Sequence, residues 1–177
     1  GWQVEREEGY VHIISTKGRP VEIYANDPAK DVEGSEMIIR LLAKRGLKPG
    51  VVVHRGHSER APETIARIPP TARIVYLGSC GSYNNVASVL DKSLSVHILS
   101  TKGVGTMFIN DLLLKMLNDT IRDGNDIHWP AFWAEAERKL GRNPAFRDYV
   151  APHRNIGVLF LKTYYQLVPQ QASSPIE

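Results

Sequence analysis

The chain has 177 residues, of which 42% are hydrophobic and 23% are charged, and its net charge is +3. This composition is that of a globular protein and excludes collagen, low-complexity and intrinsically disordered classes. The basic residues are scattered singly and form no phosphate-binding stripe, so nucleic acid is not expected as a partner. No apolar run approaches the roughly 18 residues that a transmembrane helix needs, so no membrane span is expected.

The length is that of one domain able to bury a core without metal or disulfide bonds. Cys80 is the only cysteine and cannot form an internal disulfide. We expect residues 1–169 to form a single α/β domain and residues 170–177 to form a flexible tail. The abrupt start, GWQVEREEGY, is typical of a segment cut from a longer protein, whose other domains would be further partners.

The N-terminal part predicts a β-hairpin followed by a helix. Tyr10–Ser15 and Val21–Tyr24 are rich in β-branched and aromatic residues and flank a glycine-containing turn. From Val32 to Leu42 apolar residues recur at helical spacing, and Gly46 follows as an end signal.

Three short apolar runs then predict strands that are buried on both faces: Val51–Val53, Ile74–Leu77 and Val96–Leu99. The segments between them predict short helices at Pro62–Ile68 and Val86–Leu90. Strands that alternate with helices imply a parallel sheet with helices on its faces.

The C-terminal part predicts two longer helices, Phe108–Ile121 and Trp129–Leu140, the second of which carries an aromatic packing face. The apolar segment Gly157–Leu161 is strand-like in composition. The predicted fold class is therefore α/β, with an N-terminal β-hairpin and a mainly parallel sheet of about five or six strands that has helices on both faces.

Candidate functional residues follow the predicted parallel strands, whose carboxyl ends are the usual place for ligands. His54 and His57 follow the first strand, and Cys80 follows the second. If these strands are neighbours, an imidazole and the only thiol share one rim of the sheet, as a Cys–His nucleophilic pair requires. The backbone N–H of Gly56 or Gly81 is the candidate donor to an oxyanion.

The other histidines are not expected to be functional residues, and a metal site is not expected. His97 lies in an apolar run and is interpreted as a core histidine, while His12, His128 and His153 have no evident partner. A zinc site would require two histidines of one irregular loop beside Cys80, which is not the usual ligand spacing. We therefore expect no metal and no cofactor.

The two strand-end segments resemble a known family. A hydrophobic strand ending in Gly-His, followed by one ending in a small residue and Cys, is shared by caspases, legumains, gingipains and clostripain, the caspase-like cysteine peptidases. GHS at 56–58 is similar to the gingipain GHGS, and LGSCGS at 77–82 is similar to its Cys segment, within a resemblance over residues 20–120. The resemblance implies a peptide or protein substrate, Cys80 as nucleophile, and His57 as the residue that activates it or protonates the leaving amine.

The resemblance also implies where a substrate side chain binds, namely on the strand and loop after the Cys strand. The matching stretch is STKGVGTM at 100–107, so the candidate pocket residues are Ser100, Thr101 and Lys102, together with His54. Lys102 would favour an acidic substrate side chain if it points inward. Asn110 and Asp111 could serve the pocket too, although their position favours a role at the start of a helix.

Two alternative functions stay open. Ser58 stands where the family has Gly, and His57 and Cys80 are only 80 − 57 = 23 residues apart, which fits a catalytically inactive caspase-like scaffold or binding domain. GSCGS at 78–82 also approaches the G-x-C-x-G nucleophile elbow of amidotransferase-like cysteine hydrolases. However, Ser82 replaces the last Gly of that motif, and the candidate His precedes the Cys.

Overall fold

The structure is a computed structural model, and it describes residues 1–168. These residues form two compact units, one of residues 1–49 and 111–128 and the other of residues 50–110 and 129–168. The helix α4 (Met107–Arg122) contributes residues to both. The expected tail at 170–177 lies outside the described residues.

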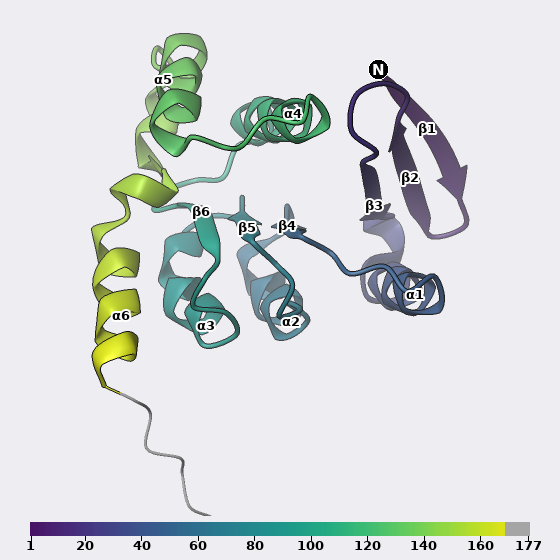
Figure 1. Cartoon of the computed structure of the whole chain (residues 1–177), viewed down its shortest axis with the longest axis horizontal. Helices are drawn as coiled ribbons and strands as arrows, with labels where there is room; N and C mark the ends of the chain where they lie inside the picture. The colour runs from purple at the N-terminus through teal and green to yellow at the C-terminus, as the bar shows by residue number, and fades with distance from the viewer. Residues whose placement is uncertain (169–177) are drawn as a thin grey trace, which may run out of the picture. The chain divides into compact units, whose positions relative to one another are not determined.

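The first unit contains an antiparallel sheet in the order β1-β2-β3 (Figure 1). Its strands are β1 (Trp2–Glu7), β2 (Tyr10–Ser15) and β3 (Glu22–Asn26). The predicted hairpin is confirmed as β2 and β3, between which the Ser15 N–H donates to the Val21 carbonyl at 3.0 Å. The strand β1 was not predicted, because its largely polar sequence lacks the apolar content by which we recognised the others.

The helix α1 (Asp31–Lys44) confirms the first predicted helix and packs against β2 and β3. Glycine allows this close approach, since a Cβ atom on Gly34 would lie 2.6 Å from the Gly9 carbonyl oxygen. Contacts between the three-stranded sheet and the part of α4 in this unit hold the unit together. The Trp2 indole N–H donates to Asp119 at 3.2 Å, and the Arg19 N–H donates to the Arg122 carbonyl at 2.6 Å.

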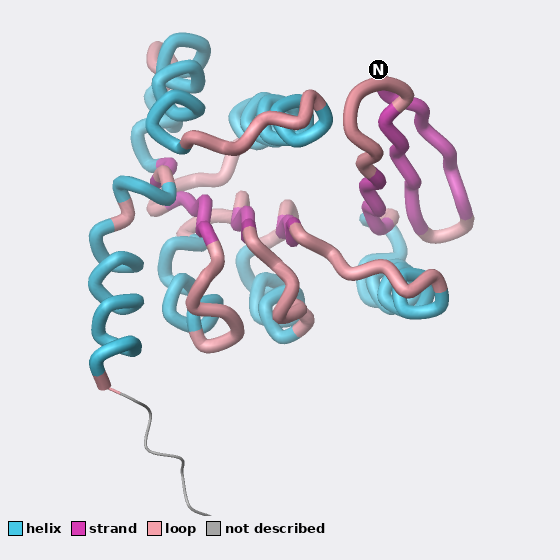
Figure 2. Tube along the Cα trace, in the orientation of Figure 1, coloured by secondary structure: helices cyan, strands magenta, loops and turns pink. Residues whose placement is uncertain are grey.

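The sheet of the second unit has the order β4-β5-β6-β7, in which the first three strands are parallel and β7 is antiparallel to β6. The strands are short (Figure 2): β4 (Val51–His54), β5 (Ile74–Leu77), β6 (His97–Thr101) and β7 (Tyr149–Val150). The predicted mainly parallel sheet of five or six strands is therefore wrong. The hairpin strands pair with β1 in a separate antiparallel sheet, and a segment interpreted as a strand is helical.

Strand position in the sheet decides burial. All four residues of β5 are buried, as predicted for a strand covered on both faces. The same prediction is wrong for β4, where Val53 is 40% exposed, because within residues 1–168 β4 is an edge strand that pairs only with β5. His97 was interpreted as a core histidine but is exposed, since it is the first residue of β6.

One face of this sheet packs on α2 (Ala61–Ala66), α3 (Val86–Leu90) and α6 (Ile156–Leu167). The alternation of side chains along β5 sends Val75 and Leu77 to this face, where they meet Ile98 of β6 and Val158 of α6. On the opposite face, α5 (Trp129–Leu140) brings Trp129 to the His97 ring, with 5.6 Å between centroids. The aromatic packing face predicted for α5 is confirmed.

The predicted strand at Gly157–Leu161 is wrong, because these residues belong to the helix α6. Asn155 caps this helix, and its Oδ1 accepts the Val158 N–H at 3.0 Å. The apolar residues that pack on the core, Val158, Leu161 and Tyr165, recur at helical spacing. In residues 1–168 no helix is long and apolar enough to cross a membrane.

Candidate functional site

The candidate site lies at the carboxyl ends of β4 and β5. In the register of these parallel strands His54 is opposite Leu77, and the Gly78 N–H donates to the His54 carbonyl at 2.9 Å. His57 and Cys80 each lie three residues beyond this pair, since 57 − 54 = 80 − 77 = 3. The predicted adjacency of the two strands is confirmed, and the segments that carry the imidazole and the thiol leave the same rim.

Cys80 is presented to solvent by a glycine turn. Its side chain is exposed and forms no disulfide, whereas Ser79 and Ser82 on either side are buried. Gly81 has φ 59°, in the left-handed region, and begins the short 3-10 helix Ser82–Asn85. The backbone therefore turns directly after the thiol.

The Cys80 loop packs backbone to backbone against the loop that follows β6. The Gly81 N–H donates to the Gly103 carbonyl at 2.8 Å, and a Cβ atom on Gly105 would overlap the Gly78 carbonyl. The amide of Gly81 is thus already engaged and does not offer its proton to an oxyanion. For Gly56, the assignment as an oxyanion donor stays a prediction.

Asn110 fixes the first residue of the Cys80 loop. Its Nδ2 donates to the Gly78 carbonyl at 2.9 Å, while its Oδ1 accepts the hydroxyls of Tyr76 at 2.7 Å and Tyr149 at 2.8 Å. The side chain is 5% exposed. Asn110 therefore holds the start of the Cys80 loop through hydrogen bonds instead of lining a pocket. This role follows from tertiary contacts and could not be inferred from the sequence. Asp111 is exposed on α4.

The Tyr149 hydroxyl is close enough to Cys80 and Arg55 for their charges to affect its pKa. Burial raises the pKa of its hydroxyl, and a negative charge on Cys80 raises it further, whereas Arg55 and hydrogen bonds with Thr106 lower it. The phenol is protonated at neutral pH and donates to Asn110. Its oxygen also accepts the Thr106 N–H at 3.0 Å.

His54 supports the segment that carries His57. Its Nε2 lies 3.1 Å from the His57 carbonyl oxygen, and its Nδ1 lies 2.9 Å from the Thr64 hydroxyl. Because a carbonyl only accepts, Nε2 carries the proton. His54 is buried and both its ring nitrogens are engaged, so it does not line a substrate pocket, while His57 is exposed.

The remaining expected pocket residues are mostly buried. Ser100 and Thr101 belong to β6, which extends two residues beyond the predicted strand. The Thr101 hydroxyl accepts the Gly103 N–H at 3.2 Å. Lys102 is exposed, but its ammonium lies 4.8 Å from the centroid of the Tyr83 ring, in cation–π contact.

Exposed apolar residues follow the loop that packs against the Cys80 segment. Val104 is 61% exposed, Met107 is 72% exposed and Phe108 is 64% exposed. They flank Gly105, which contacts the backbone of Gly78. Exposed apolar residues therefore lie close in sequence to the glycine that packs on the Cys80 loop.

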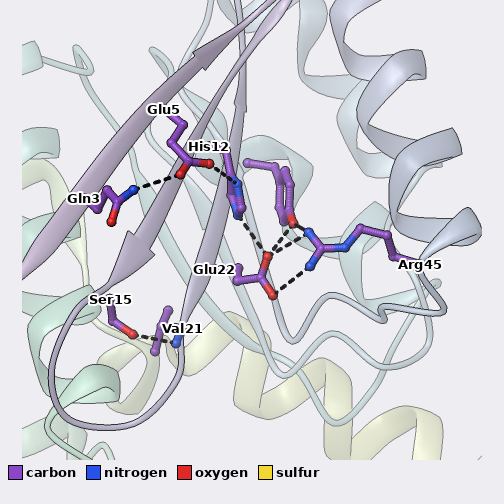
Figure 3. Close-up of polar contacts among 8 residues, drawn as sticks. Gln3, Glu5, His12, Ser15, Val21, Glu22 and Arg45 are labelled. Carbon is purple, nitrogen blue, oxygen red and sulfur yellow. Dashed lines mark hydrogen bonds and ion pairs between the residues drawn. The ribbon is translucent and has the colours of Figure 1, made fainter.

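A second polar cluster lies on the sheet of the first unit (Figure 3). His12, for which no partner was identified from the sequence, has Nε2 at 2.9 Å from Glu22 and Nδ1 at 3.4 Å from Glu5. Its ring stacks on Tyr24 with 4.4 Å between centroids. Register explains the grouping, because Glu5, His12 and Tyr24 are directly opposite one another on adjacent strands.

Arg45, just after α1, completes this cluster with an ion pair to Glu22 at 2.8 Å (Figure 3). The hydrogen bonds of Tyr24 and Arg45 lower the pKa of Glu22, while burial and the contact with Glu22 raise the pKa of Tyr24 to about 12. These contacts tie the helix to the sheet. Within residues 1–168 no group of three or more His, Cys, Asp or Glu side chains is arranged to hold a metal ion.

Comparison with protein-family models, curated proteins and solved structures finds no match to this chain. The resemblance to caspase-like cysteine peptidases consequently rests on residues 56–58 and 77–82.

Proposed function

We propose that this chain is a cysteine peptidase or a closely related amide hydrolase, in which Cys80 is the nucleophile and His57 is its acid–base partner. One observation carries the proposal. The parallel strands β4 and β5 are in register at His54 and Leu77, and His57 and Cys80 each follow three residues after the end of their strand. The exposure of both Cys80 and His57 supports it, because substrate must reach both side chains.

The proposed reaction proceeds through a thioester. The Cys80 sulfur attacks the amide carbonyl carbon, and the thiol proton passes to His57. The C–N bond then breaks, and His57 gives this proton to the departing amine. His57 then takes a proton from water, whose oxygen attacks the thioester carbon. The C–S bond breaks, the carboxylic acid leaves, and His57 returns its proton to the sulfur.

Hydrogen bonds from neighbouring side chains restrain the two segments that carry His57 and Cys80. The hydrogen bond from His54 to the His57 carbonyl restrains the backbone of the acid–base residue. Asn110 restrains the loop of the nucleophile through the Gly78 carbonyl. The Gly56 N–H is the proposed oxyanion donor, since the amide of Gly81 is engaged by Gly103.

The surroundings of the thiol favour an apolar substrate side chain near the scissile bond. Val104, Met107 and Phe108 are exposed and lie within three residues of Gly105, which packs on the backbone of Gly78. Lys102, which would favour an acidic side chain, is engaged with the Tyr83 ring. Burial of apolar substrate groups against these side chains is therefore the proposed source of preference, which the sequence alone left open.

Labelling by peptidyl acyloxymethyl ketones tests this proposal. A probe with Leu or Phe beside the ketone should modify Cys80 about 10-fold faster than one with Asp, as one well-buried apolar group allows. Intact-mass spectrometry measures the labelling rate, and Cys80→Ala is the unreactive control. Phe108→Ser should reduce the ratio between the rates of the Leu or Phe probe and the Asp probe. Faster labelling by the Asp probe would contradict the apolar preference, and no labelling by any probe would contradict the peptidase.

A further inference from the structure

The helix α6 has a second apolar face that points away from the core. This helix lies beside α3 at the margin of the second unit (Figure 1), and Val158, Leu161 and Tyr165 pack against the core. Large apolar side chains are nevertheless exposed along the rest of the helix. They are Ile156 at 79%, Leu159 at 48%, Phe160 at 66%, Tyr164 at 48% and Leu167 at 75%, and we refer to them as the α6 stripe.

The area of the α6 stripe is large for a solvent-exposed surface. If a large apolar side chain presents roughly 150–250 Å², these exposures amount to about 600 Å². The largest apolar patch of a typical monomer is about 300–600 Å² and often has a function, and the α6 stripe lies at the upper end of this range. Complete burial of two such stripes would remove about 1,200 Å² from water, which is the most that they can contribute and compares with the roughly 1,000 Å² that a specific interface needs.

The charge of α6 is compatible with a second copy of the same helix. Lys162 is the only charged residue in Ile156–Leu167. Its Nζ donates to the Val96 carbonyl at 2.6 Å, so the ammonium is directed to the protein and away from the stripe. Two stripes can therefore meet without opposing like charges.

The order of residues in the stripe is compatible with two-fold symmetry. Around a midpoint near residue 162, an antiparallel copy would bring the aliphatic Ile156 opposite Leu167 and the aromatic Phe160 opposite Tyr164. An interface across a two-fold axis needs such self-complementarity, because one patch meets itself. We propose that the α6 stripe is the interface of a symmetric dimer of this chain, in which the two α6 helices pack antiparallel.

Sedimentation of the full chain tests this interface. The wild type should be dimeric at about 10–100 μM, the range of a modest interface, and Phe160→Glu should be monomeric because it buries two unpaired carboxylates. Phe108→Glu is the matched control, since Phe108 has nearly the same exposure, 64%, outside α6, and it should stay dimeric. Circular dichroism checks that both variants are folded. A monomeric wild type, or a dimer unaffected by Phe160→Glu, would overturn the proposal.

Cross-linking tests the antiparallel orientation separately. In a Cys80→Ser background, Ile156→Cys and Leu167→Cys chains are prepared singly and treated with a short bis-maleimide. The mixture of the two should give a cross-linked heterodimer, whereas each variant alone should cross-link poorly. Efficient cross-linking of either variant with itself would exclude the antiparallel arrangement.

Discussion

Cys80→Ala is expected to abolish peptide cleavage, and His57→Ala to reduce it at least about 100-fold. The first change removes the sulfur atom that forms the thioester. The second removes the group that gives a proton to the leaving amine and takes one from water. The measurement is digestion of a peptide library, followed by mass spectrometry. Cleavage that persists in Cys80→Ala would refute the thioester mechanism.

His97→Ala is the matched control for the loss of an imidazole in this experiment. His97 is exposed and begins β6, whereas the candidate site lies at the carboxyl ends of the parallel strands. Its replacement should leave cleavage within about 3-fold of the wild type, because the ring contacts Trp129 of α5 and lies at the amino end of β6, away from the candidate site. An equal loss in His97→Ala and His57→Ala would mean that neither histidine acts specifically.

Asn110→Ala is expected to lower the free energy of unfolding by about 2–4 kcal/mol, because a buried carbonyl loses its donor and two hydroxyls lose their common acceptor. These partners are Gly78, Tyr76 and Tyr149. Urea denaturation followed by tryptophan fluorescence gives the value. The large effect arises because the contacts are shielded from water and the truncated side chain leaves a cavity.

Tyr76→Phe separates the hydrogen bonds of this network. It removes one hydroxyl but leaves Asn110 bonded to Tyr149 and Gly78, so a loss of about 1 kcal/mol is expected. If Asn110→Ala lowers the free energy of unfolding by less than about 0.5 kcal/mol, the substitution behaves like an ordinary surface change. That result would contradict the structural role of the Asn110 amide.

The local elements of the fold were largely predictable. Apolar residues at helical spacing identified α1, and the short run Ile74–Leu77 identified β5, because periodicity and burial act on neighbouring residues. Non-local pairing was not predictable in the same way. The strand β1 is largely polar, and β7 has only two residues, so neither carries a pattern that tells which sheet it joins.

The helix α6 was predicted as a strand for a different reason. Its apolar residues face both the core and the exposed α6 stripe, so an almost continuous apolar run hides the helical period. Composition then favoured a strand. The cap by Asn155, which accepts the Val158 N–H, was the signal that could have corrected this interpretation.

At the candidate site, the shared rim could be predicted because the ends of neighbouring parallel strands coincide. The supporting groups could not. Asn110 meets Tyr76 and Tyr149 across 34 and 39 residues of chain, and no local pattern encodes such contacts. The burial of Ser100 and Thr101 likewise follows from the length of β6, which the sequence defined only to within two residues.

The pairing of Cys80 with His57 is tested most directly by the rate at which iodoacetamide alkylates Cys80 at pH 6. Only the thiolate reacts, and a neighbouring imidazolium favours the thiolate at a pH where a free cysteine is protonated. The wild type should react at least about 10-fold faster than both free cysteine and His57→Ala, with His97→Ala unchanged. A wild-type rate equal to that of free cysteine and unaffected by His57→Ala would contradict the pair and favour an inactive scaffold.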